Sequence, residues 1–528
     1  MPAVEARCEV VILETSDLHG NVFPINYGNH EETNAGLAKI ATIIQQERQK
    51  AENTLLIDNG DVLQGTPLTY HYAKFLSDKK NPLIGALNYL QYDAAIIGNH
   101  EFNYGMGLIK KAVNESDFPW LSANILDEKR TESFFGPPYV IKEFENGLRV
   151  AVLGVTTHYI PNWENPSHIE GLHFADVFET TRKWVKFLQG NETYDLLVVS
   201  YHGGFERDLS SGEPTESLTG ENQGYRLCHE IEGIDVLLTG HQHRRIMENV
   251  NGITVIQPGS NGQAIGKITI QFQLDDDKWR IVGNAAELVE VDDSTATDRN
   301  VLALAEEFER QTQEWLDQTI GEIVGDMTVY SAFEVRIMDH PLIEFINRVQ
   351  MDAAGVDISS TALFHNESPG FSNHVTMRDI VSNYIYPNTL KVIRISGQDL
   401  KGALEKCATY FTLDDHNQIK VNPAFAEPKP QHYNYDMWEG IEYELNISNP
   451  VGARVVKLNY HGKPVNFSNH YDVVMNNYRA GGGGDYEMFK DKPVIKDIQT
   501  DMTEILADYF LKRKTVIASC DGNWRVRV

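Results

Sequence analysis

Five short polar clusters, each placed directly after an apolar run, constrain this sequence more than any other feature. They read SDLHGN, DNGDVLQG, IIGNHEFNYG, VSYHGG and LTGHQHR, and each contains a glycine that lets the backbone turn sharply. The apolar runs alternate with helical patterns such as those at 37–49 and 177–188. This alternation predicts an α/β layered fold in which polar residues collect where strands end.

The chain of 528 residues is too long for one hydrophobic core, so we expect at least two domains. A polar helix pattern without Gly or Pro occupies 294–320, and the sequence changes character on either side of it. We therefore predict an N-terminal domain at 1–293, a linker helix within 294–325 and a second, α+β domain at 326–528. The expected strands are 9–14, 54–58, 94–97, 149–155, 195–200, 235–239, 253–257, 390–395, 442–447 and 471–475. Two further helices are expected at 341–354 and 397–409.

The net charge of -29 argues against a nucleic-acid polymer as partner, because binding a polyanion relies on Lys and Arg at the contact. A small phosphorylated molecule is compatible, since bound dications reverse the local potential. No run of apolar residues is long enough for a membrane span, and we expect a monomer or a weakly associating homo-oligomer. The N-terminus lacks a signal-peptide pattern, which favours the cytoplasm, although an exported protein whose signal has been removed would look the same.

The four cysteines, at 8, 228, 407 and 520, have no CxxC spacing. Spacing of this kind does not indicate a disulfide framework or a zinc finger. We therefore expect buried, unreactive thiols.

The polar clusters contain a set of side chains that can bind divalent metal ions: Asp17, His19, Asp61, Asn99, His202, His241 and His243. All offer oxygen or nitrogen and none offers a thiolate, which suits Mn, Zn, Fe or Mg. In DxH and HxH, extended backbone would place both side chains on the same side. Two such ions about 3.5–4 Å apart can neutralise a phosphate ester and present a hydroxide for in-line attack.

Each cluster taken alone has a simpler interpretation. An isolated DxH seldom marks a metal site, and Asp61 or His202 alone would more often be a helix cap or a satisfied polar residue. The five clusters occur together, each at the end of a predicted strand, and GNHE is the most specific of them. Their combination indicates a phosphoesterase with two metal ions.

The ordered set DxH, GDxxxG, GNHE, H and GHxH resembles the calcineurin-like metallophosphoesterases over residues 9–275. The resemblance implies a layered domain with a β-sandwich flanked by helices. It also implies that Asp61 bridges two ions, with the other ligands divided between them as Asp17, His19 and His243 on one ion and Asn99, His202 and His241 on the other. His100 would stabilise the transition state or protonate the leaving oxygen, and the alternative is that it only orients a ligand.

Residues 331–528 are similar to the C-terminal domain of the 5′-nucleotidase superfamily. The 5′-nucleotidase branch carries an Asp three residues after the catalytic His and a Gly-Gly-x-Arg phosphate clamp. Here Asn103 takes the place of that Asp, and the corresponding run TALFHNESPGFSNHVTMRDIVSNYIYPNTL lacks the Gly-Gly-x-Arg clamp. Both features are similar to the 2′,3′-cyclic-nucleotide 2′-phosphodiesterase/3′-nucleotidase branch. A neutral amide at 103 cannot stabilise an imidazolium as a carboxylate would, so a His–Asp dyad does not transfer to this chain.

The same resemblance implies a nucleotide site in the second domain. Tyr435 and Tyr478 would stack the base between them, Asp485 would accept from a ribose hydroxyl, and Asn366 would contact the substrate. The alternative is that these tyrosines belong to the core beside a flexible glycine loop at 481–484.

We therefore expect hydrolysis of 2′,3′-cyclic nucleotides and 3′-nucleotides with two divalent ions. The alternative enzyme is a 5′-nucleotidase or UDP-sugar hydrolase. A remoter alternative is a non-catalytic nucleotide-binding protein, which would be expected to lack some of the metal ligands.

Overall fold

The computed structural model describes residues 6–528 except 128, 130, 131, 217, 387, 428 and 499. The chain divides into two compact units, Met1–Thr312 and Gln313–Val528. Helix α7 (Arg299–Leu316) runs across this division in the sequence and is shorter than the 294–320 pattern suggested. Among the helices described, none combines the length and the apolar character that a membrane crossing requires.

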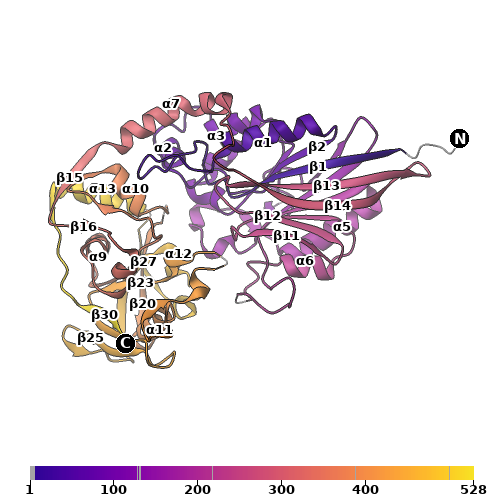
Figure 1. Ribbon diagram of the computed structural model, residues 1–528. Coiled ribbons are helices and arrows are strands. Elements are labelled where there is room, and N and C mark those ends of the chain that lie inside the picture. Colours follow the sequence, from indigo (N-terminus) through magenta and orange to yellow (C-terminus); the bar gives the residue numbers. More distant parts are fainter. Residues whose placement is uncertain are drawn as a thin grey trace. The chain divides into compact units, whose positions relative to one another are not determined.

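Within its described residues, the first unit is built on two sheets of six strands each (Figure 1). The first sheet has the order β14 (Lys278–Glu290), β13 (Ala264–Asp275), β1 (Arg7–Thr15), β2 (Thr54–Asp58), β3 (Ala94–Ile96) and β4 (Trp120–Leu121). The second has the order β11 (Arg245–Val250), β12 (Ile253–Pro258), β10 (Val236–Thr239), β9 (Leu196–His202), β7 (Arg149–Thr156) and β6 (Tyr139–Glu143). Strands β1, β2 and β3 run parallel to one another, as do β7, β9, β10 and β12. Strands β5 (Ile125–Asp127) and β8 (Leu172–Phe174) form a separate antiparallel pair.

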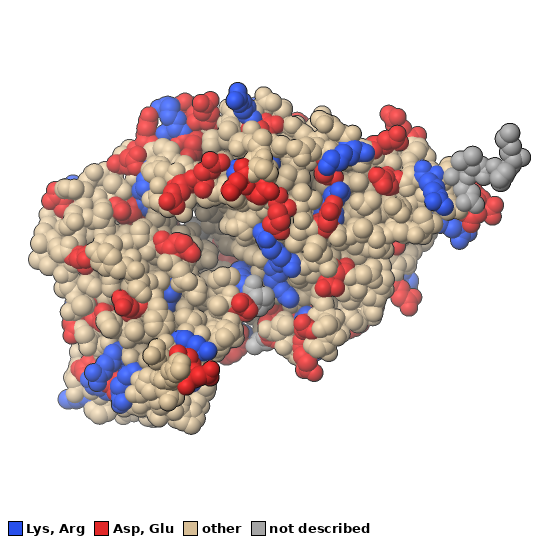
Figure 2. All heavy atoms as spheres, in the orientation of Figure 1, with Lys and Arg blue, Asp and Glu red and all other residues tan. Residues whose placement is uncertain are grey.

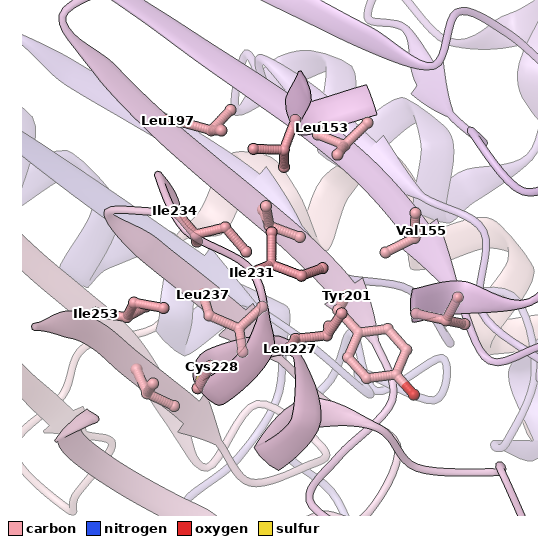
Figure 3. Close-up of a cluster of buried hydrophobic side chains, with 14 of the residues drawn as sticks. Leu153, Val155, Leu197, Tyr201, Leu227, Cys228, Ile231, Ile234, Leu237 and Ile253 are labelled. Carbon is pink, nitrogen blue, oxygen red and sulfur yellow. The ribbon is translucent and has the colours of Figure 1, made fainter. Parts of the chain in front are cut away.

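The two sheets pack face to face through a buried apolar cluster, and strand alternation builds this core. On β7, Val150 and Val152 belong to the cluster that both sheets share. Leu153 and Val155 point the other way, into a second buried cluster with residues of α5 (Val177–Asn191) and α6 (Gly224–Glu230), part of which is drawn in Figure 3. The second sheet is therefore buried on both faces, which explains why its central strands are continuously apolar.

The remaining helices of the first unit are α1 (Leu37–Lys50), α2 (Pro67–Phe75), α3 (Pro82–Tyr89) and α4 (Met106–Glu115). Sequence signals set the starts of two of them. Thr66 forms a capping box with Thr69 before α2, and the Asn81 side chain accepts from two backbone N–H groups before α3. A proline follows each cap at a position where its missing N–H costs nothing.

The predicted fold class is confirmed, with a β-sandwich flanked by helices followed by an α+β unit. Every predicted strand before residue 275 matches an observed strand to within two residues at each end. The long hairpin of β13 and β14 was not predicted. All side chains of β14 are exposed or half-buried, so it lacks the buried apolar run that identified the other strands.

The second unit has a central sheet of order β23 (Asp436–Glu439), β17 (Ile358–Ala362), β27 (His470–Asn476), β20 (Leu390–Ser396) and β28 (Val494–Ile498). A smaller sheet has the order β26 (Lys463–Pro464), β25 (Val455–Tyr460), β24 (Glu442–Asn446) and β30 (Trp524–Arg527), and another has the order β19 (His374–Thr376), β15 (Thr319–Val324) and β29 (Thr515–Ile517). Strand β16 (Met327–Thr328) pairs with β18 (Gly370–Phe371), and β21 (Phe411–Leu413) pairs with β22 (Ile419–Val421). Its helices are α8 (Ala332–Ile337), α9 (Pro341–Ala354), α10 (Met377–Asn383), α11 (Gly397–Ala408), α12 (Asn477–Ala480) and α13 (Met502–Arg513).

Acidic side chains are spread over the face drawn in Figure 2, interspersed with basic ones, as the net charge of -29 leads one to expect.

Two of the four cysteines, Cys228 and Cys407, are buried as predicted, and burial raises the pKa of their thiols to about 12 and about 11. The prediction is wrong for Cys520, which is exposed, and Cys8 is only half-buried.

Candidate metal centre

The predicted metal ligands all lie at the ends of the central strands of the two sheets. Asp17 and His19 follow β1, Asp61 follows β2 and Asn99 follows β3. His202 is the last residue of β9, and the loop after β10 carries His241 and His243. Because the carboxyl ends of parallel strands meet at one edge, the fold brings loops from distant parts of the sequence together.

The first group of ligands contains Asp17, His19 and His243, whose ligand atoms lie within 4.8 Å of one another. The Nε2 atoms of His19 and His243 are 3.0 Å apart, and the His243 Nε2 is 3.3 Å from Asp17 Oδ1. Asp17 is fully buried, and its carboxylate also accepts from the backbone N–H of His241.

The second group contains Asp61, His202 and His241, again within 4.8 Å. His202 Nε2 lies 3.2 Å from Asp61 Oδ2. Asn99 Oδ1 completes the group, 3.1 Å from His202 Nε2 and 2.9 Å from His241 Nδ1.

Backbone hydrogen bonds tie the Asp61 loop to the loop that carries Asp17 and His19. The structure thus brings all the predicted ligands together. The bridging role of Asp61 stays a prediction.

The arrangement of hydrogen bonds around three histidines fits a bound cation. The Nδ1 atoms of His19 and His202 face the backbone carbonyls of Gln64 and Asn59, and His241 Nε2 faces the Glu221 carboxylate. These oxygens can only accept, so the nitrogen that faces them carries the proton. In the neutral ring, the other nitrogen therefore turns a lone pair toward the cluster, where further acceptors already lie. Lone pairs that converge in this way are stabilised by a positive ion between them, and a fixed outer N–H is typical of metal-binding histidines.

The charges of the site support the same interpretation. Burial alone would raise the pKa of Asp61, but attraction to His202 holds it well below its ordinary value. Burial alone would lower the pKa of His202, but Asp61 raises it to about 10. In the metal-free protein a proton between these side chains therefore balances the carboxylate, and a metal ion must displace that proton to bind.

The backbone at the ligands is in the left-handed region rather than extended. Asp17, His19, Asp61, His241 and His243 have φ values between 48° and 65°. The expectation that DxH and HxH present their side chains through extended backbone is therefore wrong. Left-handed conformations cost about 1–3 kcal/mol each for residues other than glycine and persist where the surrounding structure enforces them, often at functional sites.

Glu101, the last residue of GNHE, enforces the conformation of the Asp61 loop. Its fully buried carboxylate accepts from the backbone N–H groups of Asp61, Val62, Leu63 and Gly98, at 2.7 to 3.1 Å. A Cβ at Gly98 would lie 2.3 Å from Asp61 Oδ1, so only glycine allows this close approach. Sequence reasoning did not identify this role of Glu101, although the GNHE motif contained the residue.

His100 lies beside the predicted metal ligands without belonging to either group. Its backbone N–H donates to Asp61 Oδ1 at 2.7 Å, and its ring meets the ring of His19 edge-on with centroids 5.2 Å apart. His100 Nδ1 is 2.7 Å from Asn103 Oδ1, and Asn103 Nδ2 donates to Glu164 Oε2 at 2.8 Å. The hydrogen-bonded series therefore runs from His100 to the amide of Asn103 and from there to the carboxylate of Glu164. Nothing in the local sequence pattern had pointed to Glu164.

In the second unit, the prediction that Tyr435 stacks on a base does not agree with the structure. The Tyr435 side chain is fully buried, its ring stacks on Tyr410 at 4.8 Å, and its hydroxyl donates to the Arg336 carbonyl. Tyr435 is therefore a core residue. Its neighbour Tyr433 is half-buried and lies 6.4 Å from Tyr478, edge to face.

The other predicted substrate contacts have partners within the second unit. Asp485 is 58% exposed and forms an ion pair with Lys406 at 3.1 Å. Asn366 is exposed; its Oδ1 accepts from Arg336 at 2.7 Å and its Nδ2 lies 3.0 Å from His432 Nε2.

The buried side chain of Arg479 contacts the loop at Gly481–Gly484. This buried side chain forms an ion pair with Asp436, and its guanidinium donates to the carbonyl groups of Gly483 and Tyr433. The glycine loop and the Tyr433 segment are therefore fixed to one buried arginine, a connection that the sequence did not indicate.

Comparison with known families gives two matches that together cover most of the chain. A family model described as calcineurin-like phosphoesterase matches residues 10–245. One described as 5′-nucleotidase, C-terminal domain, matches residues 318–491. The first match contains all the predicted metal ligands.

Individual proteins resemble the chain over nearly its whole length. It is 27% identical to a 2′,3′-cyclic-nucleotide 2′-phosphodiesterase/3′-nucleotidase of Yersinia enterocolitica, covering 99% of this chain and 89% of that protein. It is also 27% identical to the trifunctional nucleotide phosphoesterase protein YfkN of Bacillus subtilis, over 98% of this chain but only 38% of that protein's length. A solved structure from Staphylococcus aureus, described as a candidate 5′-nucleotidase in complex with α-ketoglutarate, is 37% identical with a TM-score of 0.89, covering 98% of this chain and all of that one.

The hydrogen bonds of Glu101 give a first testable prediction. We expect Glu101→Gln to lower the free energy of unfolding by about 2 kcal/mol or more, because its amide group would face buried N–H donors that the carboxylate now satisfies. Urea denaturation of the metal-free protein measures this loss, with the exposed Glu145→Gln as the matched control. Equal midpoints for the two variants would contradict the assigned role of Glu101.

Proposed function

The chain belongs to the calcineurin-like phosphoesterases, enzymes that hydrolyse phosphoric esters, and from this premise we propose its substrate class. We propose that it converts 2′,3′-cyclic nucleotides to 3′-nucleotides, and 3′-nucleotides to nucleoside and phosphate. The observation that carries the proposal is the convergence of the metal ligands beside His100, which is paired with the amide of Asn103 instead of a carboxylate. The names of the Yersinia enterocolitica relative and of a Salmonella typhimurium relative, 29% identical over 90% of this chain, support the same substrate class.

The proposed cofactor is a pair of divalent ions, drawn from Mn, Zn, Fe and Mg. When bound, such ions neutralise the phosphoryl oxygens and lower the pKa of water that attacks phosphorus. In the proposal Asp61 contributes to both ion sites. Asp17, His19 and His243 complete one site, and Asn99, His202 and His241 complete the other.

We propose that His100 serves the leaving oxygen of the ester. Its ring lies next to that of His19, and Asn103 engages its Nδ1. The Nε2 atom of the protonated ring is therefore the one that can donate to an alkoxide as the ester bond breaks, which leaves a neutral ring with its proton on Nδ1. A nucleoside oxygen is a poor leaving group, so its protonation in the transition state accelerates the reaction.

For the base, we propose a contact with the half-buried rings of Tyr433 and Tyr478 in place of the buried Tyr435. The two rings meet at 70°, so a base would stack on one of them and meet the edge of the other. Stacking is tolerant of base identity because every base presents a π face. The exposed side chains of Asp485 and Asn366 stay candidates for the ribose.

We propose a small nucleotide as the partner of this protein and the cytoplasm as its compartment. Export is the alternative that cell fractionation would distinguish.

The substrate proposal predicts the order of specificity constants. We expect kcat/KM for 2′,3′-cyclic AMP and 3′-AMP to exceed that for 5′-AMP by about tenfold or more, because the specificity constant reports how well the transition state fits. Phosphate release measures the hydrolysis of 3′-AMP and 5′-AMP, and chromatography of the 3′-AMP and adenosine formed measures the opening of 2′,3′-cyclic AMP. Each assay is run with and without a metal chelator. A preference for 5′-AMP would instead support the 5′-nucleotidase alternative, to which a Vibrio cholerae relative named 5′-nucleotidase, 24% identical over 95% of this chain, already points.

The base contact gives a separate prediction. We expect Tyr478→Ala to weaken nucleotide binding by about 1–3 kcal/mol, seen as a higher KM with little change in kcat, since the lost stacking acts on substrate and transition state alike. Phe467→Ala is the matched control, because this exposed aromatic side chain lies in the same unit. An unchanged KM for Tyr478→Ala would exclude a contact between Tyr478 and the base.

A further inference from the structure

Glu164 lies between two short helical turns, η2 (Ile160–Asn162) and η3 (Pro166–His168), and its side chain is only 7% exposed. Its Oε1 atom accepts from the Asn165 backbone N–H at 2.7 Å and lies 3.0 Å from His168 Nδ1. Its Oε2 atom accepts from Asn103 Nδ2 at 2.8 Å. Three donors therefore hold this carboxylate in one place.

The carboxylate determines how the neighbouring amide is oriented. Because an ionised carboxylate can only accept, Asn103 must turn its NH₂ group toward Glu164. Its Oδ1 atom then faces His100, 2.7 Å from Nδ1. An amide oxygen also only accepts, so His100 Nδ1 must donate. The proton of the neutral ring is thereby placed on Nδ1, and Nε2 is directed to the site. The proton that His100 gives to the leaving oxygen is therefore the second proton of the imidazolium, on Nε2.

The neighbouring residue connects the same segment to the metal ligands. The ring of Trp163 stacks on that of His241, with centroids 5.4 Å apart and planes 26° from parallel. Consecutive residues of this segment therefore contact a metal ligand and the side chain that orients His100. This gives the segment a role in positioning both parts of the centre.

We propose that Glu164 is a positioning residue, which acts through Asn103 to fix the tautomer and the orientation of His100. This inference rests on the proposed function, in which His100 serves the leaving oxygen. The chain supplies a carboxylate one hydrogen bond further from the histidine than a His–Asp pair would. Asn103 links the two residues by oriented hydrogen bonds and transfers no proton in the reaction.

The hydrogen bonds make a reciprocal exchange possible. Asn103→Asp alone would bring two carboxylates to within about 3 Å of each other, because the present donor would become an acceptor. Adding Glu164→Gln restores a donor between the two positions. In this double variant the carboxylate introduced at position 103 could still accept from His100. The amide oxygen introduced at position 164 could still accept from the backbone N–H of Asn165. The double substitution therefore keeps the hydrogen bonds between the two positions while it moves the negative charge from position 164 to position 103.

The test measures kcat and KM of the metal-loaded enzyme for 3′-AMP and for p-nitrophenyl phosphate. For Asn103→Asp we expect kcat on 3′-AMP to fall by about tenfold or more, with KM little changed. Repulsion from Glu164 turns the introduced carboxylate away from its place beside His100, and assistance to the leaving group is lost. For p-nitrophenyl phosphate we expect a fall of less than about threefold, since p-nitrophenolate leaves without a proton. The double variant should return kcat on 3′-AMP to within about threefold of the starting enzyme.

Controls separate positioning from folding and from metal loss. Glu170→Gln, an exposed change near the same segment, should leave both activities unaltered. Both Asn103→Asp and the double variant should be fully folded at the assay temperature, as their thermal midpoints show, and should have equal metal content. The proposal is overturned if the double variant is no better than Asn103→Asp, or if both substrates lose activity equally.

A readout without turnover keeps this inference distinct from the proposed function. In the metal-free protein labelled with ¹⁵N at histidine, we expect the His100 ring to carry its proton on Nδ1, and Glu164→Ala to mix the two tautomers. An unchanged tautomer in Glu164→Ala would overturn the proposal. A starting enzyme that prefers 5′-AMP would refute the proposed substrate but leave the comparison intact, with 5′-AMP then taking the place of 3′-AMP.

Discussion

The convergence of many acceptor atoms on a small volume is the constraint on which the first unit depends. Carboxylate oxygens, an amide oxygen and imidazole lone pairs lie about 3 Å from one another at the ends of two packed sheets. Such a cluster is repulsive unless positive charge lies within it, and the raised pKa of His202 indicates that a proton takes this place when no metal is bound. The left-handed backbone at Asp17, Asp61 and His241 adds strain to this repulsion. The fold must therefore be rigid enough to hold a site that is unfavourable when empty.

Several sets of contacts, at increasing distance from the predicted metal ligands, make the site rigid. The apolar cluster between the sheets fixes the strand ends, and Glu101 fixes the Asp61 loop through backbone N–H groups. Outside these, acceptors such as Glu221 hold the outer nitrogens of the histidines that are predicted to bind metal. Glu164 extends the same principle to His100, the side chain that does not bind metal in the proposed mechanism. Each set of polar contacts replaces conformational freedom with a specific hydrogen bond, which is how a preorganised site avoids reorganisation during the reaction.

Much of this organisation could be predicted from sequence because its signals are local. Strands such as β2 and β10 are buried on both faces and appear as apolar runs, and the ligand clusters directly follow them. Features that depend on distant contacts could not be predicted. Glu164 is 61 residues from Asn103, and strand β14 lacks an apolar run. Tyr433 and Tyr435 are two residues apart in one segment, and the folded chain buries Tyr435 fully but Tyr433 only in part. Sequence therefore identified what the site contains more fully than what supports it.

The central claim is that these side chains bind a pair of divalent ions with Asp61 in common. Metal analysis of the purified protein, paired with kcat measurement, tests it most directly. We expect two ions per chain, and for Asp61→Ala at most one ion, with kcat on the preferred nucleotide lower by about a thousandfold. An Asp61→Ala protein that folds normally, retains both ions and keeps its full kcat would contradict the account.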